Sequence, residues 1–301
     1  MTRVGLVLGA GGVTGEAFHR GVLAALRDVA GWDARDAEVI VGTSAGSLVG
    51  ASLRCSGSVG SRHAPAPPDA ALSRLPDLRP LLSAARRPWS VRAGVLATAL
   101  LPAGSRSTET FVAPLRRRCG GAWPARDLLV CAVRRRDGAR VVFGSPSAPP
   151  ADVATAVAAS CAIPGYFAPV VHGGEAYVDG GVHSPTNADV LAGRGLDLVV
   201  VSSPMSVAPR SSRLKLDLSA RLLWHRYLVA ECRALARQGT LVLPVEPGGD
   251  TLRALGLNTL SAARVDAIED LAREATAAAL AKPAVAGVVS LLAGGPSARA
   301  S

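Results

Sequence analysis

The same local pattern occurs twice within the first fifty-odd residues: a short apolar run, a glycine-rich turn and then a helical repeat of apolar residues. The first unit runs through the apolar stretch 4–8 into the turn 9–15, and the second through 39–41 into the turn 42–46. Apolar runs this short, bounded by glycine and followed by a helix, are typical of buried strands. The repeated unit therefore predicts an α/β fold in which successive strands are joined by helices.

The rest of the chain extends this pattern. Further apolar runs rich in valine and leucine predict strands at 128–133, 141–143, 198–201 and 241–245, and helical stretches are predicted at 153–159, 213–238 and 262–281. Nearly continuous apolar strands that alternate with helices indicate a mostly parallel sheet covered on both faces. With 301 residues and 49% hydrophobic content, the chain can bury a substantial core.

We expect a single domain over residues 1–293. The stretch 56–104 is rich in Pro, Ser, Arg and Ala and poor in strand pattern, which predicts a variable insert or lid. The alanine-rich tail at 294–301 is predicted to be frayed.

The net charge of +10 comes almost entirely from arginine, since Lys215 and Lys282 are the only lysines. Solvated faces are the simplest interpretation of the arginine clusters at 86–87, 116–118 and 134–136. The same clusters leave open a peripheral contact with an anionic membrane. Aromatic residues make up 4% of the chain and do not alternate with the clusters, so we expect no nucleic-acid partner.

The cysteines are few and scattered. There are five of them, without a Cys-x-x-Cys pair, at positions Cys55, Cys119, Cys131, Cys161 and Cys232. An odd, dispersed set predicts reduced thiols rather than a disulfide framework or a zinc site. No signal-peptide pattern opens the chain, and no run reaches the roughly 18 apolar residues of a spanning helix. We therefore expect a cytoplasmic protein without a metal or cofactor.

The sharpest chemical signal is the sequence Gly42-Thr-Ser44-Ala-Gly46, placed directly between a short strand and a helix. This is the context of a nucleophile elbow, in which small neighbours allow a strained turn to expose a serine hydroxyl. The amides that open the next helix then face the place where negative charge develops. Ser44 is therefore the candidate nucleophile. An ordinary glycine-rich turn is the alternative.

The glycine loop at the first turn has two interpretations. Gly11, Gly12 and Val13 present consecutive amides that could bind the oxyanion of an acyl-transfer intermediate. Glycine loops after a first strand also bind the pyrophosphate of dinucleotides. However, the Gly-x-Gly-x-x-Gly spacing does not begin at Gly9, and the acidic residue expected later is only ambiguously present. We therefore favour the oxyanion interpretation.

A carboxylate supplies the candidate base. Asp179 ends a short extended run and is followed by Gly180 and Gly181, so it could orient and deprotonate a serine directly. A histidine triad in the order Ser, acid, His could use only His183 or His225. In the α/β-hydrolase fold, which uses a triad in this order, the elbow follows several strands. Ser44 follows only the second predicted strand, which disfavours the triad.

Together these motifs resemble the patatin-like phospholipase family. The stretch 158–169, the sequence Tyr-Val-Asp-Gly-Gly at 177–181 and the sequence Ser-Pro-Thr-Asn at 184–187 are similar to that family's segments around its catalytic aspartate. The resemblance covers residues 1 to about 55 and about 125 to 205.

The resemblance implies a three-layer α/β/α sandwich that hydrolyses lipid or small esters through a Ser44–Asp179 dyad. Two positions depart from the family's Gly-Gly-Gly-x-Arg/Lys-Gly loop, with Ala10 at the first glycine and Thr14 at the cation. The missing cation weakens the expectation of phospholipid-headgroup recognition. Two alternatives stay open: a catalytically silent module that binds lipid or a partner, and an acyltransferase.

Overall fold

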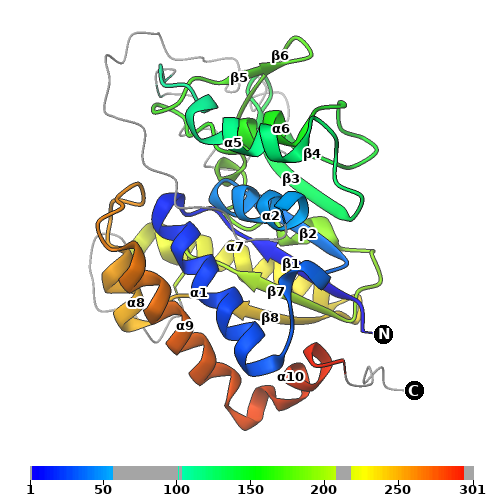
Figure 1. Cartoon of the computed structure of the whole chain (residues 1–301), viewed down its shortest axis with the longest axis vertical. Coiled ribbons are helices and arrows are strands. Elements are labelled where there is room, and N and C mark those ends of the chain that lie inside the picture. The colour runs from blue at the N-terminus through cyan, green and yellow to red at the C-terminus, as the bar shows by residue number, and fades with distance from the viewer. Residues whose placement is uncertain (1, 57–100, 102–103, 208–217, 295–301) are drawn as a thin grey trace.

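A central eight-stranded sheet organises the molecule in the computed structural model, which describes residues 2–56, 101, 104–207 and 218–294 (Figure 1). Its strands are β1 (Val4–Leu8), β2 (Val39–Thr43), β3 (Asp127–Arg134), β4 (Arg140–Phe143), β5 (Val170–His172), β6 (Glu175–Asp179), β7 (Leu198–Ser202) and β8 (Leu241–Val245). The longer helices are α1 (Gly12–Ala30), α2 (Ala45–Ser56), α5 (Glu109–Cys119), α6 (Val153–Ser160), α7 (Leu218–Ala236) and α9 (Val265–Leu280). Most of the proposed insert at 56–104 and the tail at 295–301 lie outside the described residues.

Most of the sheet is parallel, as the sequence predicts. Strands β3, β2, β1, β7 and β8 are parallel neighbours in that order. Strands β4 and β6 pair with β3 in the antiparallel direction, and β5 forms a hairpin with β6. The predicted strand positions each correspond to a strand here.

Helices cover both faces, which confirms the predicted α/β/α layering. Alternate strand residues point to opposite faces. Leu6 and Ile40 belong to the core packed beneath α1, α2 and α9, whereas Val7 and Val41 belong to the core that includes Leu228 of α7. Helices α1 and α9 pack side by side (Figure 1).

The antiparallel strands determine where two distant segments meet. Strand β4 pairs with residues 130–133 of β3. These residues include some that also pair with β2 and others that also pair with β6. A strand has two edges, so β2 and β6 must share the other edge of β3, end to end. Thr43 pairs with Cys131, and Asp179 pairs with the next residue, Ala132. The carboxyl ends of β2 and β6 therefore face each other.

The prediction for the cysteines is wrong in one respect. Cys55 at the end of α2 and Cys119 at the end of α5 form a disulfide, with their Cα atoms 5.1 Å apart. Helices α2 and α5 pack against each other, and this brings together two cysteines that are 64 residues apart in sequence. No local spacing could reveal such a pair. Cys131 and Cys161 are buried free thiols, and Cys232 is a partly buried one.

Among the described helices, none is long and apolar enough to cross a membrane alone. One bent pair, α9 together with the segment Pro283–Leu292, passes the length and composition test with an 83° bend.

Candidate active site

Ser44 occupies a strained turn between β2 and α2. Its φ is 53°, which costs a residue with a side chain about 1–2 kcal/mol. The turn requires its flanking glycines, because a Cβ at Gly46 would lie 2.0 Å from the Leu8 carbonyl oxygen and one at Gly42 would lie 2.5 Å from the Cα of Ser47. Ser44 is 4% exposed. These features are those of a nucleophile elbow.

Two serines hold the backbone of this turn. The Oγ of Ser160 accepts a hydrogen bond from the Ser44 amide at 2.9 Å and donates one to the Cys131 carbonyl at 2.6 Å. The Oγ of Ser47 donates to the Ser44 carbonyl at 2.6 Å. Strained backbone persists where its surroundings over-determine it, and these bonds meet that condition.

Asp179 ends β6 and is 5% exposed. Burial raises the pKa of its carboxyl from 3.8 to about 6, opposed by hydrogen bonds from the Ser44 side chain and the Gly181 amide. The Gly181 amide lies 2.7 Å from Oδ1. Gly180 packs so tightly that a Cβ there would lie 2.2 Å from the Cys131 carbonyl oxygen. The structure thus brings the two residues of the predicted dyad together.

The glycine loop leaves three amides open. Helix α1 begins at Gly12, so its first amides have no partner within the helix. The amides at 9, 10, 14 and 15 donate to the carbonyls of Ser202, Pro185, Thr259 and Gly11, respectively. Among the described residues, the amides of Gly11, Gly12 and Val13 have no hydrogen-bond acceptor. They are the three that the sequence singles out for an oxyanion.

The two departures from the family loop have structural explanations. Ala10 has no positive φ, so its Cβ causes no strain. Thr14 is 3% exposed, and its Oγ1 donates to the Gly11 carbonyl at 3.3 Å. Its amide donates to Thr259 at 3.1 Å. Thr14 therefore fixes the loop and contributes no charge to it.

The loop lies beside the other two segments. The Gly46 amide donates to the Gly9 carbonyl at 3.2 Å, which joins the start of α2 to the end of β1. A Cβ at Gly181 would lie 3.2 Å from the Cβ of Ala10. Ser44, the Asp179 carboxylate and the open amides thus gather at the carboxyl ends of β1, β2 and β6.

Three histidines of the described chain have partners other than Ser44 and Asp179. His19 is buried, with Nε2 at 2.8 Å from the Gly9 carbonyl and Nδ1 at 2.7 Å from the Ser202 hydroxyl. Burial lowers the pKa of His19 to about 4. His225 lies 2.8 Å from Glu246, and His172 lies 2.7 Å from the Pro150 carbonyl. His63 lies outside the described residues.

Sequence reasoning gave no role to two contributors to the site and included a third only among the amides that open the helix after Ser44. The third is the Ala45 amide, which follows Ser44 at the position that supplies an oxyanion donor in nucleophile elbows. Ser160 was seen only as part of a family-like stretch, and its contact with Ser44 spans 116 residues. Asn187 donates from Nδ2 to Thr43 Oγ1 at 3.1 Å, directly beside the nucleophile. Only Ala45 had a local signal.

No group of three or more His, Cys, Asp or Glu in the described part of the chain is arranged to hold a metal ion.

Comparison with known proteins gives one family. A family model described as "Patatin-like phospholipase" matches residues 6–192, more than half of the chain. No curated protein matches. Among solved structures, VipD from Legionella pneumophila has a TM-score of 0.39 and 13% identity over 91% of this chain and 66% of that one. The type III effector protein ExoU has a TM-score of 0.39 and 15% identity over 92% of this chain and 53% of that one. The chain thus spans less than two thirds of either protein.

Proposed function

The chain belongs to the patatin-like phospholipase family, and from this premise we propose that it hydrolyses carboxylic esters of lipids through a Ser44–Asp179 dyad. One observation carries the proposal. Asp179 is a buried carboxylate whose raised pKa, about 6, suits a general base near neutral pH, and the strands that end at Thr43 and Asp179 pair with successive residues of β3.

The proposed reaction uses only groups of this site. Asp179 takes the Ser44 proton as Oγ attacks the ester carbonyl carbon. The amides of Gly11, Gly12 and Val13, with that of Ala45, stabilise the oxyanion. Collapse of the intermediate breaks the ester C–O bond, and the leaving alkoxide takes the proton from Asp179. Water, deprotonated by Asp179, then attacks the acyl-enzyme and releases the acid and Ser44.

The deciding test is labelling with a fluorophosphonate, with the modified serine located by peptide mass. We expect labelling of Ser44, turnover of p-nitrophenyl esters, and loss of both in Ser44→Ala but not in Ser147→Ala, which changes an exposed loop serine. Asp179→Asn should abolish turnover while Asp250→Asn, on the surface, should not. A folded protein without labelling would instead favour the silent binding module. Turnover only with an added alcohol or thiol acceptor would favour the acyltransferase.

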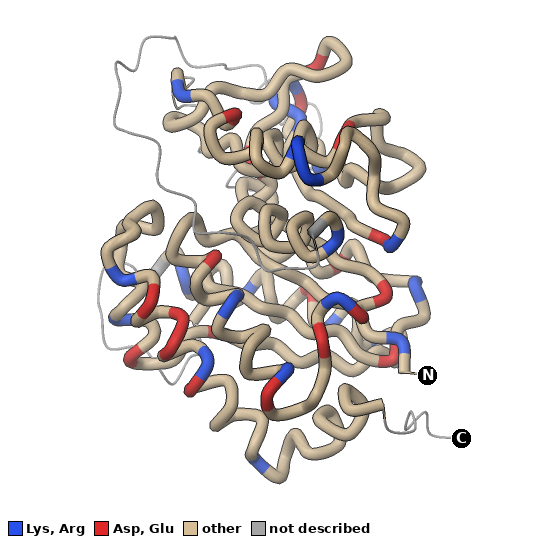
Figure 2. Tube along the Cα trace, in the orientation of Figure 1, with Lys and Arg blue, Asp and Glu red and all other residues tan. Residues whose placement is uncertain are grey.

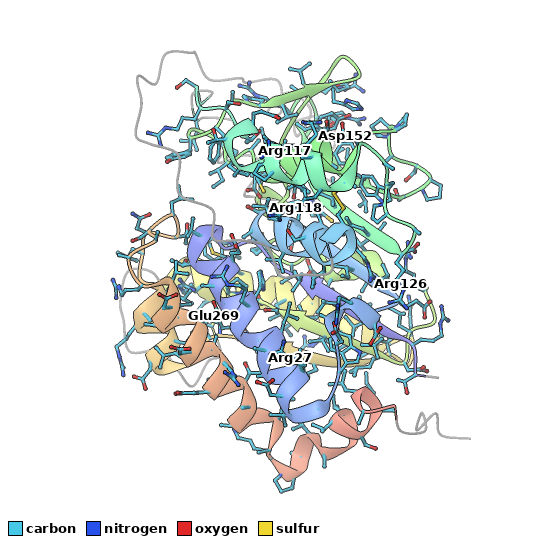
Figure 3. The ribbon with its side chains drawn as sticks, in the orientation of Figure 1. Arg27, Arg117, Arg118, Arg126, Asp152 and Glu269 are labelled. Atoms are coloured by element: carbon cyan, nitrogen blue, oxygen red, sulfur yellow. A yellow bond between two sulfur atoms is a disulfide. The ribbon has the colours of Figure 1, made fainter. Side chains whose placement is uncertain are left out.

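Contact with an anionic membrane is a second part of the proposal. Several arginines of the clusters are paired with carboxylates: Arg116 with Asp152 and Arg134 with Asp137. Arg117 and Arg118, at the end of α5, are exposed and carry the contact proposed here (Figures 2 and 3). Replacing both with glutamine should weaken salt-sensitive co-sedimentation with anionic vesicles. Equal binding to neutral vesicles would contradict the proposal.

A further inference from the structure

A buried carboxylate on α7 lies outside the dyad. Glu231 is 3% exposed and belongs to the helix that covers the sheet face opposite α1 and α2. Its Oε1 accepts a hydrogen bond from the Ser184 hydroxyl at 2.6 Å, and its Oε2 accepts from the Thr186 hydroxyl at 2.6 Å and the Ala188 amide at 2.9 Å. One side chain thus fixes three positions of a five-residue segment, residues 184–188.

This segment contacts each part of the candidate active site. The Pro185 carbonyl accepts the Ala10 amide at 2.8 Å, next to the open amides of the glycine loop. Asn187 donates from Nδ2 to Thr43, which precedes the nucleophile, and to the Ser184 carbonyl at 2.6 Å. The Ser184 amide donates to the carbonyl of Gly180, which follows the aspartate.

The segment does not hold this shape by local preference alone. Asn187 has a φ of 53°, a left-handed conformation that needs support from its surroundings. Its Oδ1 accepts from Arg140 at 3.2 Å, and that arginine also pairs with Asp189. The Ser184 hydroxyl accepts a hydrogen bond from the backbone amide of Asn187 at 3.3 Å while it donates one to Glu231. The carboxylate therefore holds the turn that presents the Asn187 amide group to the elbow.

We infer that Glu231 is a positioning residue of the ester-hydrolysing site, acting through residues 184–188 on the glycine loop, the elbow and the Asp179 turn. This inference rests on the proposed function. It assigns to α7 a part in the chemistry although α7 contributes no group to the dyad or to the open amides.

The hydrogen bonds to Glu231 suit the ionised form of its carboxyl group. These three donors point at the two carboxylate oxygens, which are acceptors only when the group is ionised, whereas protonation turns one of them into a donor. Burial raises the pKa of this carboxyl, while the Ser184 and Thr186 hydroxyls oppose that rise. Among the described residues, the charged groups near Glu231 include Asp189, which raises the pKa further, and its partner Arg140. An amide in place of the carboxylate keeps the volume but has one acceptor oxygen for three donors.

The test uses Glu231→Gln with Glu246→Gln as its matched control. Glu246 is also a largely buried glutamate beside α7, where it contacts His225, but no hydrogen bond or ion pair joins it to residues 184–188 in the described structure. Rates are normalised to the serine that a fluorophosphonate titrates. We expect kcat of Glu231→Gln to fall at least tenfold with KM within twofold, and Glu246→Gln to match the wild type.

A pH profile separates positioning from simple destabilisation. If the Asp179 turn shifts, Asp179 loses hydrogen bonds that lower its pKa, so the acid limb of kcat/KM should move above its wild-type position near pH 6. Within the described residues, the Cys161 thiol interacts with Asp179, and burial raises its pKa, so it stays protonated across this range. The control should keep the wild-type limb.

A double-variant cycle tests whether Glu231 acts through residues 184–188. Thr186→Val removes one donor to Glu231 and keeps the shape. Its effect on kcat should be much smaller in the Glu231→Gln background than in the wild type, because both changes break the same link. Additive effects, or a Glu231→Gln enzyme with wild-type kcat and acid limb, would overturn the inference and leave the dyad standing. A wild-type protein that does not label would overturn both.

Discussion

The glycine turns after β1 and β2 look alike in sequence but differ in what they present. Each follows one of two adjacent parallel strands and starts a helix. The turn after β2 places one side chain, Ser44, in a strained conformation and uses its amide in a bond to Ser160. The turn after β1 presents no side chain and leaves the amides of Gly11, Gly12 and Val13 open. One local motif can therefore either present a side chain or leave backbone amides open, depending on where the hydrogen bonds go.

The turns also respond to protons in opposite ways. His19 supports the first turn through Gly9 and must remain neutral, since its pKa is lowered to about 4. Asp179, next to the second turn, has a pKa raised to about 6, so its ionisation opposes folding. Lowering the pH should therefore destabilise the first turn, because His19 becomes protonated. At the second turn it should remove the cost of burying a charge, because Asp179 becomes neutral.

The largest effect should come from Ser44→Gly. Turnover should fall at least about 10⁴-fold, because the nucleophile is lost. The variant should nevertheless unfold with a free energy about 1 kcal/mol higher than that of Ser44→Ala, since glycine tolerates a φ of 53°. Urea unfolding of both variants checks this, and equal stabilities would show that the elbow is not strained.

Gly46→Ala should be the most damaging change for the fold. A Cβ 2.0 Å from the Leu8 carbonyl forces β1 and α2 apart, and the free energy of unfolding should fall by about 3 kcal/mol or more. Gly287→Ala is the control, because a Cβ there meets nothing within 4 Å in a helix. It should be neutral or slightly stabilising. A well-folded Gly46→Ala protein would contradict the close approach.

His19→Gln should reduce acid sensitivity. In the wild type, the unfolded chain binds a proton at His19 below pH 6.5 while the folded chain does not until about pH 4. Stability is therefore lost as pH falls through this window, by up to about 3 kcal/mol. Glutamine can donate to Gly9 and accept from Ser202 without titrating. Unfolding at pH 7.5 and pH 4.5 should show a smaller loss in the variant, and an equal loss would sink the assignment.

Asp179→Asn should change the pH dependence of stability in the opposite direction. Its net effect on the free energy of unfolding should be the smallest of these variants. The raised pKa means that the carboxyl reduces wild-type stability as pH rises from about 4 to about 6. Asparagine avoids this cost of about 3 kcal/mol but loses part of the bond to Gly181, which leaves a gain of about 1–2 kcal/mol above pH 7. The inactive variant should thus be the more stable one there. A variant less stable at every pH would show that the hydrogen bonds outweigh the burial.

By itself, the sequence determined what depends on neighbouring residues. Short apolar runs bounded by glycine define the strands, including β1 at 4–8. The motif Gly42-x-Ser44-x-Gly46 after such a run predicts the elbow, whose backbone distant contacts then hold. The pattern also predicted the mostly parallel sheet and the layers on its two faces. Asp179 could be named as a candidate base from its own motif, but its pairing with Ser44 as a dyad rested on the family resemblance, because nothing local links residues so far apart.

Only the tertiary structure decided which distant segments meet. The shared edge of β3 sets β2 and β6 end to end, and this carries Asp179 to Ser44. Packing of α2 on α5 pairs Cys55 with Cys119, against the prediction of free thiols. Glu231 resembles any helix glutamate in sequence until folding buries it against residues 184–188. The physical reason is the same in each case: local sterics fix a turn, whereas strand register and helix packing choose partners that may be anywhere in the chain.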